Sequence, residues 1–221
     1  MNHDPAERCR LYLITPPRFE LAEFAEALDD ALGGGDVACV QLRMSEIDGD
    51  GLARVAKVLI PLCHAKDVAF LIEGRADVAK ATGADGVHLA RAGDLDNARR
   101  LLGGDAICGV SAGGSRHAAM LAAEAGADYV SFGALHRSVT MPKAVVISPD
   151  ILSWWSEVME GPCVAIGGID AANAAALAAT GVDFLAVITG VWNHGDGPAA
   201  AVAAFNSKID SPRQDQERDT S

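Results

Sequence analysis

Residues 162–169 read PCVAIGGI, and residues 184–189 read FLAVIT. Each stretch has the continuous apolar character of a parallel strand that is buried on both faces. The first stretch ends in two glycines and the second ends in a threonine. Glycines let backbone N–H groups approach an anion closely, and a following helix N-terminus favours negative charge. The two stretches therefore predict consecutive parallel strands with an anion site at their ends.

Similar apolar runs recur along the whole chain, and their number decides the fold. In a (β/α)₈ barrel the loops after the seventh and eighth strands usually hold a phosphate. Six apolar runs precede residue 162, and Ala-rich amphipathic stretches separate all of them. The sequence therefore predicts an α/β fold, a single-domain (β/α)₈ TIM barrel. The expected strands are Leu11–Thr15, Val37–Leu42, Val68–Ile72, Asp85–Leu89, Ala106–Val110, Tyr129–Phe132, Cys163–Ile166 and Phe184–Ile188.

The connections between these runs support a repeated βα unit. A Gly-x-Asp segment precedes three of the predicted strands, beginning at Gly83, Gly126 and Gly181. Glycine at a helix C′ position is the chemistry expected of an αβ loop. A doubly wound open sheet is the alternative, but it needs a Gly-rich turn after the first strand. The sequence has Thr-Pro-Pro-Arg there, at residues 15–18.

Composition and charge narrow the class of protein. The chain has 221 residues, of which 50% are hydrophobic, and no apolar stretch of about 20 residues, so neither a membrane span nor a secretory signal is expected. A net charge of −12 argues against nucleic acid as a partner, whereas small phosphorylated substrates remain compatible with it. Five cysteines without a Cys-x-x-Cys pair indicate reduced thiols in a cytoplasmic protein. The sequence leaves open whether the chain forms an oligomer.

The chain divides into three parts on this interpretation. Residues 1–10 form an N-terminal extension, and residues 11–208 form the barrel. Residues 209–221 are polar, without a large apolar side chain after residue 209, and we expect them to form a disordered tail.

Polar residues at the predicted carboxyl ends of the strands are the first candidates for a site. Gln41 and Arg43 are two apart and face the same side of a strand, where they suit a diphosphate. A barrel-filling Gln and a surface Arg would give the same pattern. His88 is a candidate base or a structural histidine, and Ser111 is an anion donor or a helix N-cap. These alternatives stay open at the level of the sequence.

Residues 133–143 form the longest polar loop that follows a predicted strand. Its hydroxyls, Ser138 and Thr140, and its cations suit phosphate oxygens, and such a loop often moves as a lid. A solvated surface loop is the alternative.

Together these segments resemble a known family. They occur in the order expected of thiamine phosphate synthases, and the related thiazole tautomerases share much of the framework. The resemblance runs from about residue 11 to residue 205. The segments that carry it are Leu13–Thr15, Val40–Arg43, Gly83–Leu89, Gly109–Ser111, Gly126–Tyr129, Ala165–Ile169 and Ala186–Thr189.

The resemblance implies an enzyme that joins hydroxymethylpyrimidine diphosphate to hydroxyethylthiazole phosphate and releases diphosphate. Diphosphate leaves first in the family mechanism, helped by Mg²⁺ and cationic side chains, and the thiazole nitrogen captures the resulting cation. The resemblance assigns the diphosphate to Gln41 and Arg43. It assigns ligand contacts to Ser111, Ser138 and Thr140, and the thiazole phosphate to Gly167, Gly168, Ile188 and Thr189.

The sequence departs from the family on the metal and diphosphate side. The family has Arg-Glu-Lys after strand two, where this chain has Arg-Met-Ser, and Met141 replaces a Lys. The usual Mg²⁺ carboxylates are missing after strands three and four. Glu73 and Asp94 are the replacements on offer, each displaced by one residue, so a Mg²⁺ cofactor is doubtful.

Three functions are therefore compatible with the sequence. The first, which we favour, is a thiamine phosphate synthase with a depleted diphosphate site. The second is a thiazole tautomerase-like isomerase, with His136 or His88 as its acid and base. The third is a non-catalytic member that binds a phosphorylated ligand or a partner protein and regulates another process.

Overall fold

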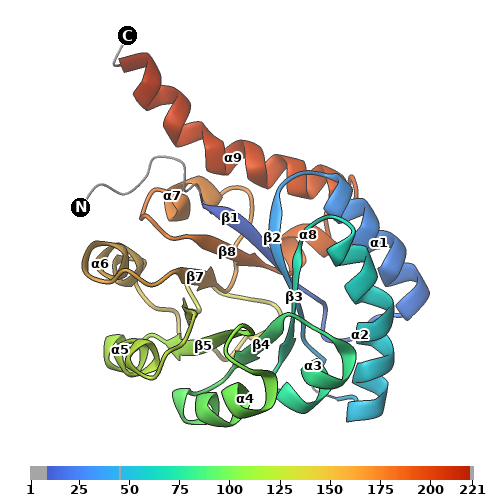
Figure 1. The fold of residues 1–221 in the computed structure, drawn as a ribbon. Coiled ribbons are helices and arrows are strands. Elements are labelled where there is room, and N and C mark those ends of the chain that lie inside the picture. The colour runs from blue at the N-terminus through green and yellow to red at the C-terminus, as the bar shows by residue number, and fades with distance from the viewer. Residues whose placement is uncertain (1–8, 45, 220–221) are drawn as a thin grey trace.

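The computed structural model describes residues 9–44 and 46–219, with side chains up to residue 210. It shows a closed barrel in which eight parallel strands pair in chain order, β1 to β8, and β8 pairs with β1. Helices surround the barrel (Figure 1). The predicted TIM barrel is therefore confirmed. The strands are β1 (Arg10–Ile14), β2 (Val37–Leu42), β3 (Ala69–Glu73), β4 (Gly86–Leu89), β5 (Ile107–Gly113), β6 (Tyr129–Phe132), β7 (Cys163–Ile166) and β8 (Phe184–Val187).

Most helices lie where the Ala-rich amphipathic stretches predict them. The exception that matters for the site is α8, a short helix directly after β8 that the sequence pattern did not reveal. Among the described residues, no helix is long and apolar enough to cross a membrane. The helices are α1 (Leu21–Gly33), α2 (Gly49–His64), α3 (Ala76–Thr82), η1 (Ala92–Asp94), α4 (Leu95–Leu102), α5 (Arg116–Glu124), α6 (Asp150–Val158), α7 (Ala174–Ala178), α8 (Thr189–Trp192) and α9 (Pro198–Asp219).

The sequence predicts an extension at the N-terminal end of the chain and a disordered tail at the C-terminal end. The N-terminal extension, residues 1–10, lies outside the described residues except for its last two positions. At the other end α9 continues to Asp219, where we expected a disordered tail from residue 209. The physical reason is that a helix, once formed, adds further residues cheaply, and Gln, Glu and Arg near the end are good helix formers.

The Gly-x-Asp segments have a structural role at the N-terminal rim of the barrel. Gly83, Gly126 and Gly181 all have positive φ values, of 74°, 86° and 83°, which end the preceding helix as predicted. The aspartate that follows each glycine accepts a hydrogen bond from a backbone N–H at or near the start of the strand before it. These bonds run from Phe70 to Asp85 at 2.6 Å, from Cys108 to Asp128 at 2.6 Å and from Cys163 to Asp183 at 2.7 Å.

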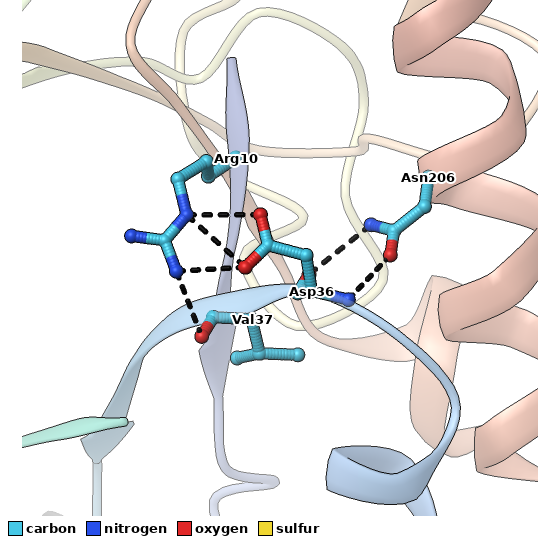
Figure 2. A network of polar contacts seen from close by, with 4 residues as sticks. All are labelled: Arg10, Asp36, Val37 and Asn206. Carbon is cyan, nitrogen blue, oxygen red and sulfur yellow. Dashed lines mark hydrogen bonds and ion pairs between the residues drawn. The ribbon is translucent and has the colours of Figure 1, made fainter. Parts of the chain in front are cut away.

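A fourth acidic residue, Asp36, precedes β2 and ties three elements together (Figure 2). Arg10 at the start of β1 donates to its carboxylate from Nε at 2.9 Å and from Nη2 at 2.7 Å. Asn206 of α9 bonds the backbone of Asp36 twice, accepting from its N–H at 2.6 Å and donating to its carbonyl at 3.1 Å. The network fastens α9 to the rim where β1 and β2 begin.

Apolar side chains form one layer between the barrel and its helices and a second group inside the barrel. The inner group includes two tyrosines, Tyr12 and Tyr129, whose rings meet edge to face at a centroid distance of 6.1 Å. Tyr129 requires a glycine on the neighbouring strand, because a Cβ on Gly109 would lie 1.9 Å from its ring. This packing fills the part of the barrel nearer the N-terminal ends of the strands. The space for a ligand therefore lies at their carboxyl ends.

All five cysteines are free thiols, and four of them are buried. Burial raises the pKa of both Cys63 and Cys163 to about 12, so these thiols stay protonated at neutral pH. They act as small apolar side chains in the core, as the sequence predicts.

Candidate active site

A cavity of about 520 Å³ lies at the carboxyl ends of the strands, above the inner core. It brings together side chains from distant parts of the chain. Sites in TIM barrels usually lie at this end and are built in this way. All but two of the residues predicted from the sequence line it. The predicted residues that line the cavity are Gln41, Arg43, Glu73, His88, Ser111, Ser138, Thr140, Gly167, Gly168, Ile188 and Thr189.

The two exceptions are His136 and Asp94. His136 lines a neighbouring cavity together with Arg137 and Pro142. Two backbone bonds to the end of β7 fix its place, because the N–H of Leu135 donates to Ile166 and that of His136 to Gly167, at 3.1 and 3.0 Å. Leu135 then enters the core, whereas the side chain of His136 faces the second cavity.

Asp94 belongs to the one-turn helix η1 and pairs with Arg91 three residues earlier, at 3.3 Å. It does not line the central cavity, so it does not join Glu73 there. Within the described ranges, no three His, Cys, Asp or Glu side chains gather closely enough to hold a metal ion. Glu73 and Asp94 therefore do not come together at one site in the described structure, and their role as Mg²⁺ ligands stays a prediction. A one-residue displacement on a rigid rim points a side chain elsewhere.

The first half of the cavity, lined by residues at the ends of β2 and β3, carries the cation of Arg43 and the amide of Gln41. The backbone N–H of Arg43 donates to the hydroxyl of Thr15 at 3.0 Å, which holds Arg43 at the rim beyond β2. Burial raises the pKa of the Glu73 carboxyl, and the positive charge of Arg43 partly opposes this. Arg43 and Glu73 thus lie near enough for their charges to interact on this side of the cavity.

A chain of buried hydrogen bonds crosses the floor of the cavity. The hydroxyl of Tyr12 donates to Gln41 Oε1 at 2.8 Å and lies 2.9 Å from the hydroxyl of Tyr129. The Tyr129 hydroxyl in turn lies 2.9 Å from His88 Nδ1, and the two rings are stacked. This chain orients the amide of Gln41 and the ring of His88 from below.

With Gln41 oriented so that its Oε1 accepts from Tyr12, the chain also sets the tautomer of His88. Tyr12 gives its single proton to Gln41, so its oxygen accepts from Tyr129, and the Tyr129 oxygen must accept from His88 Nδ1–H. The other ring nitrogen, Nε2, is then an acceptor. Burial and the nearby Arg43 lower the pKa of His88 to about 4, so the ring is neutral at neutral pH.

The second half of the cavity, formed by the segments that follow β6, β7 and β8, is rich in hydroxyls and glycines. Gly167 and Gly168 have φ values of 101° and 64°, which only glycine adopts without strain. A Cβ at Gly168 would lie 2.5 Å from the carbonyl oxygen of Arg137, so the loop after β6 packs directly against it. In that loop the hydroxyls of Ser138 and Thr140 are 2.9 Å apart.

Helix α8 completes this half and begins at Thr189. Its last residue, Trp192, donates from Nε1 to the carbonyl of Ile14 at 2.7 Å and meets Phe24 edge to face. These contacts hold α8 across the end of β1, so Thr189 has a fixed place at the cavity wall. Hydroxyls and backbone groups on closely packed segments form a site that suits a phosphate.

Sequence reasoning missed three polar side chains in and under the cavity: Tyr12, Tyr129 and Ser131. A usable signal was present, because Tyr129 and Ser131 are two apart in a strand that is otherwise apolar. Side chains two apart share a face of a strand, and Val130 and Phe132 occupy the face toward the helices. Polar residues on the remaining face had to point into the barrel.

The fold and the cavity define a TIM-barrel protein with a ligand site at the carboxyl ends of its strands. The family model for thiamine monophosphate synthase matches residues 11–191. The chain is 53% identical over 199 residues to the thiamine-phosphate synthase of Rhodospirillum centenum, covering 90% of this chain and 96% of that one. It is 46% identical over 213 residues to that of Hyphomonas neptunium, covering 94% and 96%. The protein therefore belongs to the thiamine phosphate synthase family, as the sequence resemblance predicts.

Solved structures agree with this assignment. The thiamine phosphate pyrophosphorylase of Pyrococcus furiosus superposes with a TM-score of 0.80 at 31% identity, covering 93% of this chain and 97% of that one. A geranylgeranylglyceryl phosphate synthase from Thermoplasma acidophilum superposes with a TM-score of 0.69 at 16% identity, covering 92% and 94%. The likeness to the Thermoplasma protein concerns the fold alone. The likeness to the Pyrococcus protein supports the conclusion that this chain is a transferase of thiamine biosynthesis.

Proposed function

We propose that this protein joins hydroxymethylpyrimidine diphosphate to hydroxyethylthiazole phosphate and releases diphosphate. One observation carries the proposal. One half of a single cavity contains the cation of Arg43 and the amide of Gln41, and the other half is rich in hydroxyls and glycines. Two anionic substrates that react with each other need two such halves facing one space. Relatives called thiamine-phosphate synthase, up to 53% identical over most of the chain, support the same reaction.

The proposed chemistry places the leaving diphosphate at Gln41 and Arg43. The bond between the pyrimidine methylene carbon and the diphosphate oxygen breaks, and the electron pair leaves with diphosphate. The thiazole nitrogen then donates its lone pair to the methylene cation and forms the new C–N bond. Arg43 stabilises the charge that develops on the leaving group, and its guanidinium can hold two phosphate oxygens at once.

The thiazole phosphate belongs in the other half of the cavity on this proposal. The hydroxyls of Ser138, Thr140 and Thr189 donate to phosphate oxygens, and the backbone at Gly167 and Gly168 lets the phosphate approach closely. Ile188 and Ser111 line the space between the two halves. A thiazole ring held there presents its nitrogen toward the pyrimidine.

The residues of this chain offer a single carboxylate to the Mg²⁺ that the family implies. Mg²⁺ is usually held by one or two carboxylates together with substrate oxygens, and Glu73 is the cavity's one described carboxylate. Glu73 would hold the metal on the diphosphate side, where Mg²⁺ would supply further positive charge. On this proposal Arg43 is the residue of the chain that neutralises the leaving group.

The two histidines fit the proposed reaction in different ways. His88 lines the cavity as a neutral acceptor, which suits an orienting contact to a substrate ring. His136 lies in the neighbouring cavity, so the tautomerase alternative loses its first acid–base candidate. The non-catalytic alternative requires a blocked mouth, but Arg137 is not among the cavity residues and Met141 is half-exposed at its edge.

Incubation of the protein with both substrates tests the proposal. We expect thiamine phosphate and diphosphate in equal amounts, measured by chromatography with and without added Mg²⁺. Thr189→Val, which removes one hydroxyl with little change in shape, should raise the KM for the thiazole phosphate about tenfold. Thr180→Val is the matched control, because its hydroxyl bonds Leu177 outside the cavity, and it should leave that KM unchanged.

Two results would contradict the proposal. One is a wild-type protein that forms no thiamine phosphate under either condition. The other is saturable binding of Mg²⁺ to the ligand-free protein below about 1 mM in calorimetry, which would show a built metal site and remove the assignment of charge neutralisation to Arg43.

A further inference from the structure

Ser131 of β6 has a buried hydroxyl without a hydrogen-bond partner in the described part of the chain. The residue is 3% exposed, and it lines the central cavity. A buried hydroxyl without a partner destabilises the folded protein, because water would otherwise bond it. Such a group in a ligand cavity calls for an explanation, and the bound ligand is the simplest one.

The surroundings of Ser131 direct its hydroxyl to the cavity. In the barrel Ser131 is level with Ser111 of β5 and Val164 of β7. Tyr129 lies two residues earlier on the same inward face, and its hydroxyl is already bonded to Tyr12 and His88. Val164 offers no polar side-chain group. Ser111 carries a hydroxyl at the same level, but among the described residues no bond joins it to Ser131, and it lines the same cavity. The cavity is therefore the side from which a ligand can supply the missing bond.

Depth separates Ser131 from the groups that suit a phosphate. Ser138 and Thr140 stand on the loop beyond β6, and Thr189 stands beyond the end of β8. Ser131 lies within its strand, beside the floor formed by Tyr129 and His88. On the proposed function the phosphates lie against Ser138, Thr140, Thr189 and Arg43, so a substrate ring is the part that lies deeper in the cavity.

We propose that the Ser131 hydroxyl binds the ring of the pyrimidine substrate at a nitrogen that takes no part in bond formation. This inference rests on the proposed function and extends it by one residue. The thiazole nitrogen must keep its lone pair free for the new C–N bond, so a hydroxyl donor there would oppose the reaction. A pyrimidine ring has two nitrogen acceptors, and the reacting carbon lies outside the ring.

The substitution Ser131→Ala tests this through two measurements of opposite sign. Binding should weaken, with the KM for the pyrimidine diphosphate rising about tenfold, because one hydrogen bond to the ligand is lost. The KM for the thiazole phosphate should change less than twofold. The melting temperature of the ligand-free protein should stay the same or rise, because the substitution removes an unsatisfied buried hydroxyl.

Ser156→Ala is the matched control. The Ser156 hydroxyl shares its one proton between the carbonyl oxygens of Ser153 and Thr180 outside the cavity, at 3.2 and 3.0 Å. Its loss should lower the melting temperature and leave both KM values unchanged. The two serines thus predict opposite patterns from the same chemical change.

An unchanged KM for the pyrimidine diphosphate in Ser131→Ala would overturn the inference, and so would a rise confined to the thiazole phosphate. Calorimetric titration of the wild-type protein with hydroxymethylpyrimidine diphosphate separates this failure from failure of the proposed function. If that ligand binds the wild-type protein and Ser131→Ala equally, the inference alone is wrong. If it does not bind the wild-type protein at all, the proposed function is wrong, and this inference with it.

Discussion

The two rims of the barrel use polar side chains in opposite ways. At the N-terminal rim, carboxylates such as Asp85 and Asp128 bond the backbone of neighbouring strands, and Asp36 bonds Arg10. At the C-terminal rim, Arg43 faces a cavity instead, and Ser131 faces the same cavity from deeper in the barrel. The comparison shows how one fold separates the groups that hold its strands together from the groups that a ligand can reach.

Arginine appears on both rims, which gives the sharpest test of this comparison. We expect Arg43→Ala to lower kcat/KM at least 100-fold, about 3 kcal/mol, because the charge on the leaving diphosphate loses its partner. The free energy of unfolding should stay within about 0.5 kcal/mol of the wild type. Steady-state kinetics and urea unfolding measure the two effects.

The paired control is Arg99→Ala at the other rim. Arg99 donates to the Asp128 carboxylate at 2.7 Å and to the carbonyl of Gly126 at 3.0 Å. Its removal should lower stability and leave kcat/KM near the wild-type value. The comparison fails if both variants affect activity to the same degree.

His88 lies at the cavity floor and predicts a pH dependence of stability. Its pKa is about 4 in the folded protein and about 6.5 in the unfolded chain, so between these values the unfolded chain binds a proton that the folded protein does not. The free energy of unfolding should therefore fall as pH drops from 6.5 toward 4, by about 3 kcal/mol at most. Urea unfolding at a series of pH values measures this loss.

Other groups that face His88 modify the result in known directions. Glu73, whose pKa is raised, contributes in the opposite direction because its folded carboxyl holds a proton more tightly. The variant His88→Gln isolates the histidine, and its stability should depend less steeply on pH. An equally steep dependence in this variant would mean that other groups cause the acid loss.

The smallest expected effect concerns Asn206 at the N-terminal rim (Figure 2). Asn206→Ala removes two hydrogen bonds to the backbone of Asp36 and should lower the free energy of unfolding by about 1–2 kcal/mol. Both KM values and kcat should stay unchanged, because none of the described side chains of α9 lines the cavity. A kinetic defect here would show that the two rims are coupled.

Much of the site could be predicted because it lies at the ends of strands. Gln41, Ser111 and Thr189 were found by locating the apolar runs and reading the residues at their ends, and all three line the cavity. His136 could not be placed this way. Its position depends on how the loop after β6 bonds to β7, which no local pattern encodes.

Gly167 and Gly168 also show what the sequence could indicate and what only the structure could add. The pair at Gly167 and Gly168 indicated a ligand site, and the structure adds a second reason for them. The loop after β6 packs so tightly that a Cβ at Gly167 would lie 2.7 Å from Ala134. Substitution of Gly168 would thus disturb the loop as well as any anion, which is why Thr189 is the cleaner position for a test.

The sequence by itself determined the eight strands, the barrel and the family, because each depends on local periodicity and on the order of short segments. Only the tertiary structure decided that Asp94 and His136 stay out of the cavity and that Ser131 enters it without a partner. It also decided the tautomer of His88, through a hydrogen-bond chain between Tyr12 and Tyr129, which are 117 residues apart. The physical reason is that hydrogen bonds and burial depend on which groups meet in space, and those groups come from distant parts of the chain.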